Sequence, residues 1–197
     1  MRALLLTVAS LMCGVGSPAA QWHIGVEFTA NRYRGSSYDT SSSHVVSEGR
    51  PGGGPAVGVL ISRSWQRWRA ALRLSYSNTG FALTGQGVNL TDKTTGQHVE
   101  AASLISTRVG GIGSSGAIRA ELGPALHLWD FDGEIRTRVG AVGAVAYEWP
   151  VSSRFTGAVR LEGMVSPSWF DATDVPPEFE RRVTWRYGVG LGLRYRL

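Results

Sequence analysis

The sequence of 197 residues has a single cysteine, almost no lysine and no apolar run of about 20 residues. The missing runs exclude a helical membrane protein, which needs several such segments. Charged residues make up only 18% of the chain, but hydrophobic residues reach 43%, which excludes a disordered chain. The formal net charge of +5 is modest and is not clustered along the sequence, so a nucleic-acid partner is not expected.

Residues 1–20 have the pattern of a secretory signal peptide. Arg2 supplies the positive start, residues 3–12 are apolar, and small residues then lead to a cleavage site after Ala19 or Ala20. The apolar segment is too short to span a bilayer. Cys13 could accept a lipid, but Met12 stands where a small residue is expected. We therefore expect a cleaved signal and one mature domain, residues 21–197, without cysteine, disulfide or cysteine metal site.

Beyond residue 21 the dominant hydrophobic period is two, which is the period of a β-strand with one apolar face. The last segment is the cleanest example. Every second residue from Val183 to Leu197 is apolar, and the other face holds mainly glycine and arginine. The same alternation predicts eight strands, over residues 22–30, 57–62, 68–76, 98–109, 118–128, 135–149, 155–165 and 183–197, of which 98–109 and 135–149 are the least regular.

The connections between these strands alternate in length. The first, third and seventh are long (35–54, 84–97 and 166–181), and the second, fourth and sixth are shorter (66–67, 110–116 and 150–153). Only the fifth, 130–134, breaks the alternation. Outer-membrane barrels have short turns at the periplasmic end and longer loops outside. We therefore predict an all-β fold, an eight-stranded antiparallel up-and-down transmembrane β-barrel with both termini at the short-turn end.

The two faces of the strands indicate what lies inside the barrel. In a membrane barrel the apolar face meets lipid and the polar face lines the lumen. Buried charges must be paired, and arginine grips carboxylates bidentately. Eight strands leave an interior just wide enough for side chains, so a filled lumen is favoured over a narrow anion-preferring pore. The predicted lumen charge network comprises Glu27, Arg69, Arg73, Arg119, Glu121, Arg136, Arg138, Glu148, Arg160, Glu162, Arg186 and Arg194.

Aromatic residues gather near the expected short turns, and Trp and Tyr rings suit the membrane–water interface. Two of the tryptophans flank the turn at residues 66–67. The alternative is a set of core aromatics that caps a soluble barrel. The predicted aromatic girdle comprises Trp22, Trp65, Trp68, Trp149, Phe155 and Tyr195.

The C-terminal segment Gly192-Leu193-Arg194-Tyr195-Arg196-Leu197 resembles the terminal signal of outer-membrane barrels, which usually ends in Phe. Residues 120–126 (AELGPAL) and 147–150 (YEWP) resemble a strand and a hairpin of the small OmpA/OmpX-like outer-membrane barrel domain. The resemblance covers the whole of residues 21–197. It implies an outer-membrane location and recognition of Gly192, Tyr195 and Leu197 by the barrel-assembly machinery.

A catalytic constellation is not evident in the sequence. A lipid deacylase would need a serine, a histidine and a carboxylate that converge near the outer leaflet. His127 is followed by Asp130 and Asp132, but no serine partner is evident, and a polar lumen or rim residue is the simpler interpretation. The other histidines, His23, His44 and His98, fall near strand ends or loops. The loop carboxylates lack the spacing of a Ca²⁺ loop. We expect no catalytic, cofactor-binding or metal-binding residues.

These observations together predict a non-enzymatic integral outer-membrane protein with periplasmic termini and surface loops in a structural, membrane-integrity or adhesion role. Its expected partners are outer-membrane lipids and lipopolysaccharide, with no cofactor and no nucleic acid. Three alternatives remain open, a lipid-modifying barrel enzyme, a narrow anion-preferring pore and a soluble exported ligand-binding barrel.

Overall fold

The computed structural model describes residues 21–39, 48–85, 88–92, 96–113, 115–131, 133–171, 173, 177 and 179–197. These residues form a single sheet of eleven strands. In this part of the chain, no helix is long and apolar enough to cross a membrane. The expected signal peptide, residues 1–20, and His44 lie outside the described residues.

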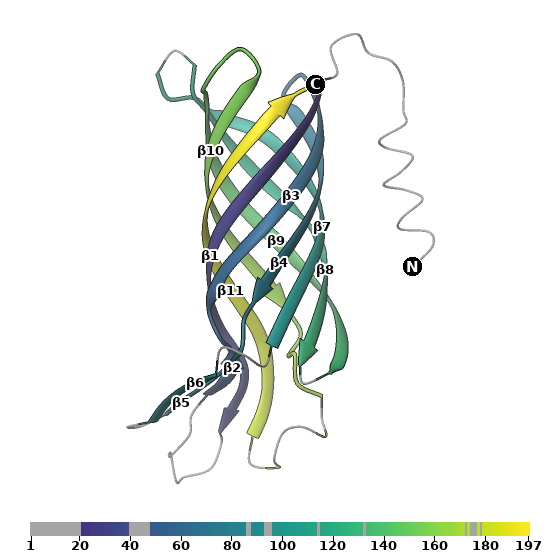
Figure 1. Cartoon of the computed structure of the whole chain (residues 1–197), viewed down its shortest axis with the longest axis vertical. Helices are drawn as coiled ribbons and strands as arrows, with labels where there is room; N and C mark the ends of the chain where they lie inside the picture. Colours follow the sequence, from purple (N-terminus) through teal and green to yellow (C-terminus); the bar gives the residue numbers. More distant parts are fainter. Residues whose placement is uncertain are drawn as a thin grey trace.

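Eight long strands form the wall of a closed barrel (Figure 1). Neighbouring strands are antiparallel, and the first strand pairs with the last along its length, from His23↔Arg196 to Asp39↔Phe179. This pairing closes the wall and leaves no free edge in it. The predicted eight-stranded antiparallel barrel is confirmed. Its strands are β1 (Gln21–Asp39), β3 (Gly54–Trp65), β4 (Trp68–Asn78), β7 (Gly96–Gly110), β8 (Ala117–Phe131), β9 (Glu134–Pro150), β10 (Phe155–Ser166) and β11 (Phe179–Arg196).

The two ends of the barrel differ. The upper end in Figure 1, here called the turn end, carries the connections at residues 66–67, 111–116 and 151–154 and the end of β11. The opposite end, the loop end, carries three short strands that continue the sheet beyond the wall. They are β2 (Glu48–Pro51), β5 (Phe81–Gly85) and β6 (Val88–Asp92). The expected loops 35–54 and 84–97 are therefore partly wrong, because strands of four or five residues are too short for a period of two to reveal.

Exposure along the strands is the inverse of that in a soluble protein. On β11, Val189 and Leu191 are 55% and 62% exposed, whereas the alternate residues Arg186 and Arg194 are 2% and 3% exposed. The same holds around the wall, where leucine, valine, isoleucine and aromatic side chains point outward. Contiguous apolar surface of this extent is not stable in water but suits the hydrocarbon of a bilayer.

The hydrogen-bond ladder between β7 and β8 is interrupted beside Pro124. Pro124 has no N–H to donate, and the pairing skips from Ala102↔Ala125 to Ile105↔Leu122. A Cβ atom on Gly123 would collide with the carbonyl oxygen of Ser103. Glycine at this position therefore lets the two backbones approach closely.

Candidate functional site in the barrel interior

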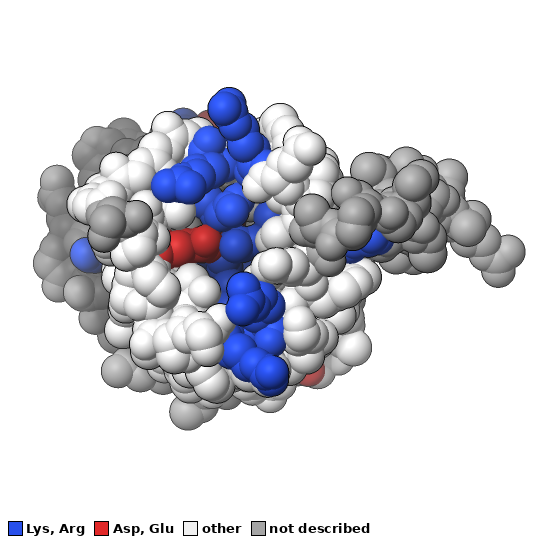
Figure 2. All heavy atoms as spheres, turned by 90° about the horizontal axis from the view of Figure 1, so that it is seen from above, with Lys and Arg blue, Asp and Glu red and all other residues white. Residues whose placement is uncertain are grey.

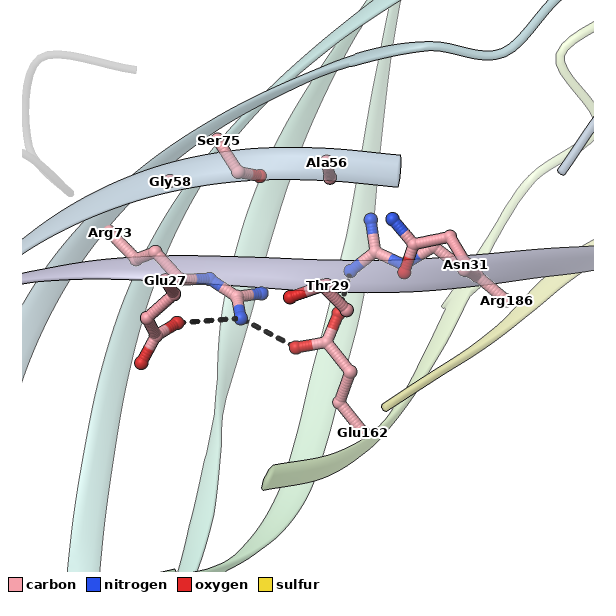
Figure 3. Close-up of a pocket in the computed structure, with 9 residues that line it drawn as sticks. All are labelled: Glu27, Thr29, Asn31, Ala56, Gly58, Arg73, Ser75, Glu162 and Arg186. Carbon is pink, nitrogen blue, oxygen red and sulfur yellow. Dashed lines mark hydrogen bonds and ion pairs between the residues drawn. The ribbon is translucent and has the colours of Figure 1, made fainter. Parts of the chain in front are cut away.

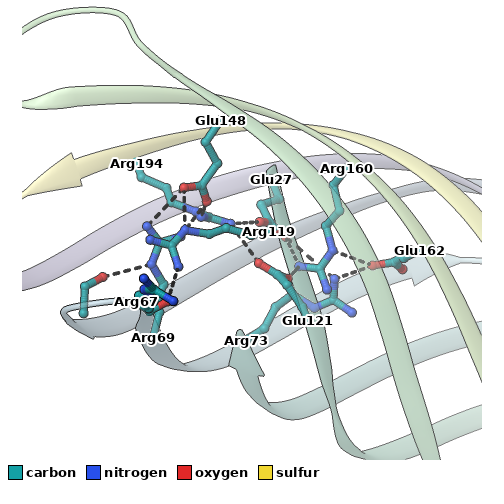
Figure 4. A network of polar contacts seen from close by, with 11 residues as sticks. Glu27, Arg67, Arg69, Arg73, Arg119, Glu121, Glu148, Arg160, Glu162 and Arg194 are labelled. Atoms are coloured by element: carbon teal, nitrogen blue, oxygen red, sulfur yellow. Dashed lines mark hydrogen bonds and ion pairs between the residues drawn. The ribbon is translucent and has the colours of Figure 1, made fainter. Parts of the chain in front are cut away.

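The interior is filled by charged side chains from all eight barrel strands except β3 (Figure 4). Each of these residues is at most 8% exposed, and each forms at least one ion pair with the opposite charge. We call this set the lumen network. It consists of six arginines, Arg69, Arg73, Arg119, Arg160, Arg186 and Arg194, and five glutamates, Glu27, Glu100, Glu121, Glu148 and Glu162.

Towards the turn end the network converges on one carboxylate, that of Glu148 on β9. Arg69 donates from Nη1 to Glu148 Oε1 (2.5 Å) and from Nη2 to Oε2 (3.2 Å). Arg119 donates from Nε to Oε2 (3.0 Å), and Arg194 also contacts Oε1. Three guanidinium groups thus share this anion, which offsets their mutual repulsion, and for Arg69 and Arg119 it is the one carboxylate contact among the described residues.

The middle of the network links five strands. Arg73 donates to Glu162 (2.5 Å) and to Glu100 (2.6 Å), and Figure 3 shows its guanidinium between Glu27 and Glu162. Arg186 bridges the same two carboxylates, with 2.7 Å to Glu100 and 2.6 Å to Glu162. Charge-assisted contacts of this length are the strong kind of hydrogen bond, and they hold strands that are distant in sequence at a fixed spacing.

Arg160 and Arg194 join the two halves of the network. Arg160 lies 3.1 Å from Glu121 and 3.3 Å from Glu162, and Arg194 lies 3.3 Å from Glu27. Because each of these side chains serves more than one partner, removal of one group disturbs several contacts.

Glycine on the lumen face of β11 makes room for the long side chains. A Cβ atom on Gly188 would lie 2.6 Å from Asn31 Oδ1 and 3.1 Å from Glu162 Cγ. On the lumen face of β11, Gly188, Gly190 and Gly192 therefore lie between Arg186 and Arg194 and leave space for the charged side chains.

Little free volume remains inside the network. A cavity of about 10 Å³ lies beside Glu27, Arg73, Glu162 and Arg186 (Figure 3). That volume corresponds to about one water molecule. The described interior around these residues is thus packed with side chains and has no room for a hydrated ion.

Aromatic side chains fill the barrel on the loop side of the network. His98 stacks on Trp129 with ring centroids 3.9 Å apart, and Trp129 meets Trp169 edge-to-face at 5.7 Å. Trp129 and Trp169 are 0% and 1% exposed. We call the set of packed rings at this level the aromatic plug. It comprises Tyr33, Phe81, Trp129, Phe131, Trp169 and Phe170.

Arg138 on β9 holds the segment that brings Trp169 into the plug. Its Nε donates to the Ser168 carbonyl oxygen (2.7 Å) and its Nη2 to the Trp169 carbonyl oxygen (3.3 Å). The same guanidinium binds Asp171 Oδ1 at 2.6 Å. From the other side, the Ser168 hydroxyl donates to the Ser36 carbonyl oxygen (2.8 Å). Arg138 therefore acts as a latch for residues 168–171.

Ten of the twelve residues predicted for the lumen lie together in the network. Arg136 and Arg138 do not, because they lie nearer the loop end, where Arg136 contacts Glu134 (2.6 Å). Glu100 was missed. It lies on β7, whose outward face includes Ala101 and Ser103, so the apolar alternation is weak there. The signal that identifies it is that the charged residues of this strand occupy even positions only.

One group of potential metal ligands occurs among the described residues, formed by His98, Glu100 and His127. His98 Nε2 and His127 Nδ1 are 3.1 Å apart, and His127 Nδ1 is 3.5 Å from Glu100 Oε2. The carboxylate already contacts Arg73 and Arg186, so a cation there would face two positive charges. The donor set is therefore a poor fit for a metal ion, and His127 is a buried lumen residue that is remote from lipid.

The predicted girdle residues all lie near the turn end. Trp65 and Trp68 are directly opposite each other across the first short turn. The Phe155 and Tyr195 rings are 5.1 Å apart on neighbouring strands, and Trp149 stacks against Tyr147. Of the expected assembly signal, Gly192 and Tyr195 lie near the end of β11 and Leu197 directly follows it, where its backbone N–H donates to the Trp22 carbonyl oxygen (3.0 Å).

A closed antiparallel barrel with an apolar outer surface and a charged, filled interior defines a membrane β-barrel. Its fold is that of small outer-membrane barrels. Neisserial surface protein A matches with a TM-score of 0.58 and 9% identity, over 90% of this chain and 99% of that one. OprG from Pseudomonas aeruginosa matches with 0.52 and 13%, over 90% and 96%.

A major outer membrane protein from Thermus thermophilus matches with a TM-score of 0.50 and 15% identity, over 89% and 99% of the two chains. No protein-family model and no curated protein matches the sequence. The fold that the resemblance to OmpA/OmpX-like barrels implied is thus confirmed by solved structures that share little sequence with this chain.

Proposed function

We propose that this protein is a non-enzymatic outer-membrane barrel that presents its loop end outside the cell in a structural, membrane-integrity or adhesion role. The lumen network carries this proposal. Its eleven paired charges fill the interior, and the aromatic plug covers them on the loop side, so the molecule is built as a solid cylinder. A narrow anion pore would need a continuous free path through these same side chains.

The location of His127 also supports a non-enzymatic role. A lipid-modifying barrel needs its catalytic histidine where a membrane lipid reaches it. His127 is 0% exposed, and its neighbours are His98, Glu100 and Trp129 inside the barrel. Lipids and lipopolysaccharide are then partners of the outer surface of the wall.

The proposal extends to export and assembly. Residues 1–20 act as a cleaved signal, the mature domain is residues 21–197, and both of its ends face the periplasm. The barrel-assembly machinery engages β11 through Gly192, Tyr195 and Leu197.

A large maleimide reagent should label Leu90→Cys on intact cells. It should label Arg154→Cys in the turn at residues 151–154 only after the outer membrane is permeabilised. The reverse result would contradict the orientation.

Single-channel recording in planar bilayers tests the closed lumen. The purified barrel should give no steady conductance. Glu148→Gln combined with Arg194→Gln, which removes the centre of the network, is the matched variant that should raise the frequency of openings. Steady large openings of the unchanged protein would overturn the proposal.

Comparison of lipid A mass profiles with and without the gene tests for enzymatic activity, and an altered acyl pattern that His127→Ala abolishes would establish it.

A further inference from the structure

The charges of the chain are spread along the sequence but sorted in space. The turn end holds eight arginines, and the carboxylates that contact them among the described residues, those of Glu27, Glu121 and Glu148, are all buried in the lumen network. Every exposed acidic side chain in the described residues lies at the loop end, which also has exposed arginines. The arginines of the turn end are Arg63, Arg67, Arg69, Arg108, Arg119, Arg154, Arg194 and Arg196.

The excess of positive charge at the turn end faces water over the mouth of the barrel. Figure 2 looks at this end and shows a band of Lys and Arg atoms that crosses it, with one small patch of Asp and Glu atoms against its middle. Arg67, Arg108, Arg154 and Arg196 are exposed, and Arg196 continues the lumen-facing alternation of Arg194. The apolar and aromatic outer surface of the wall lies around this band, so the guanidinium groups of the band are directed to the aqueous side and away from lipid.

Part of this arrangement is electrostatically unfavourable. Arg108 and Arg119 are directly opposite each other on β7 and β8, and like charges in that position are unfavourable. Arg69, Arg119 and Arg194 already share the single carboxylate of Glu148. The exposed arginines therefore have no acidic side chain of the described chain within this end to balance them. An external anion would relieve their repulsion.

We propose that the turn end is a docking face for an extended acidic peptide segment of a partner protein. Guanidinium groups bind carboxylates bidentately, and a band of them suits a run of Asp and Glu side chains in an extended chain. The backbone carbonyl of Arg67 accepts hydrogen bonds from the Arg119 side chain (3.3 Å) and the Arg108 N–H (3.1 Å), which fixes the turn that carries the Arg67 side chain. That the partner lies in the periplasm rests on the proposed orientation.

Binding of a fluorescent octaglutamate peptide to the full mature barrel in neutral detergent tests the docking face. Fluorescence anisotropy should show binding that weakens as salt is added. The combined variant Arg67→Gln, Arg108→Gln and Arg196→Gln should bind about tenfold more weakly, as expected from three exposed pairs that each contribute a fraction of a tenfold step. The matched control Arg32→Gln, Arg34→Gln and Arg181→Gln, at the loop end, should bind like the unchanged protein.

The outcomes separate this proposal from its competitors. Equal weakening by both triple variants, or no binding of the peptide, would overturn it. Loss of a preference for phosphatidylglycerol over phosphatidylcholine vesicles in the turn-end variant, without peptide binding to the unchanged barrel, would make the face a lipid site. The measurement in detergent does not depend on orientation or conductance, so its failure leaves the proposed function standing and the maleimide experiment tests that separately.

Discussion

Substitution of Glu148 by glutamine should cost far more stability than any other single glutamate-to-glutamine change in the lumen. Glu148 is the common partner of Arg69, Arg119 and Arg194, and glutamine keeps its size while it removes the charge. Breaking a buried ion pair by neutralising one partner typically costs about 3–5 kcal/mol, because the other charge is left buried without compensation. Among the described residues, Arg69 and Arg119 lose the one carboxylate that each contacts, whereas Arg194 keeps Glu27, so we expect the upper part of that range.

Two other glutamate-to-glutamine variants serve as comparisons for Glu148→Gln. Glu121 lies 3.1 Å from Arg160 and 3.9 Å from Arg194, and both arginines keep other carboxylates, so Glu121→Gln should cost about 1–2 kcal/mol. Glu134 is exposed at the loop end and pairs with Arg136, so Glu134→Gln should cost less than about 1 kcal/mol. The expected order of destabilisation is Glu148, then Glu121, then Glu134.

Urea unfolding of the barrel in lipid vesicles measures this order, with tryptophan fluorescence and heat-modifiable gel migration as the two probes. The double variant Glu148→Gln and Arg119→Gln should recover at least about 1 kcal/mol, because it removes one of the unpaired cations. If Glu148→Gln unfolds within about 1 kcal/mol of the unchanged protein, or if Glu121→Gln costs as much, the lumen network does not stabilise the barrel through its shared carboxylate.

Three further changes test other parts of the structure. Leu191→Arg on the outer face should lower the free energy of unfolding in vesicles by about 2–4 kcal/mol, and Leu191→Phe should leave it nearly unchanged. If Leu191→Arg is as stable as the unchanged protein, the lipid and lumen faces are reversed. Arg138→Gln releases the latch, so acrylamide should quench the buried Trp129 more strongly; unchanged quenching would show that the plug holds without it. Gly123→Ala forces a Cβ atom against the backbone of β7 and should reduce the folded yield, whereas Gly163→Ala, whose nearest neighbour would be 4.0 Å away, should fold normally; equal yields would contradict the close approach.

The sequence predicts well which face of a strand each side chain occupies, because successive residues of a strand point to opposite faces. The lumen and lipid faces of β11 follow from the alternation of Val189, Gly190, Leu191 and Gly192, because a strand points successive side chains to opposite sides. The same rule identifies the network members on β4, β8 and β10. On β7 it failed to single out Glu100, because small residues such as Ala101 and Ser103 are tolerated on the lipid face and blur the pattern.

Height along the barrel axis was harder to predict than the face. Arg136 and Arg138 have the parity of Glu148, and sequence pattern alone groups them with it. Their level is set by how each strand is staggered against its neighbours, which becomes visible only in the register, with Arg138 opposite His127 on β8. The aromatic plug was missed for a related reason, since Trp169 comes from a loop whose path is decided by tertiary contacts.

Pairing of β11 with β1 closes the wall and also brings arginines to the glutamates of the lumen network. Arg186 and Arg194 both lie on β11, the last strand in the chain, and between them they contact four of the five lumen glutamates at 3.3 Å or less. Until that strand takes its place, those carboxylates face an unfinished sheet with too few cations. The last strand of the chain thus completes both the hydrogen-bonded wall and the charge balance, so a barrel that lacks β11 lacks both.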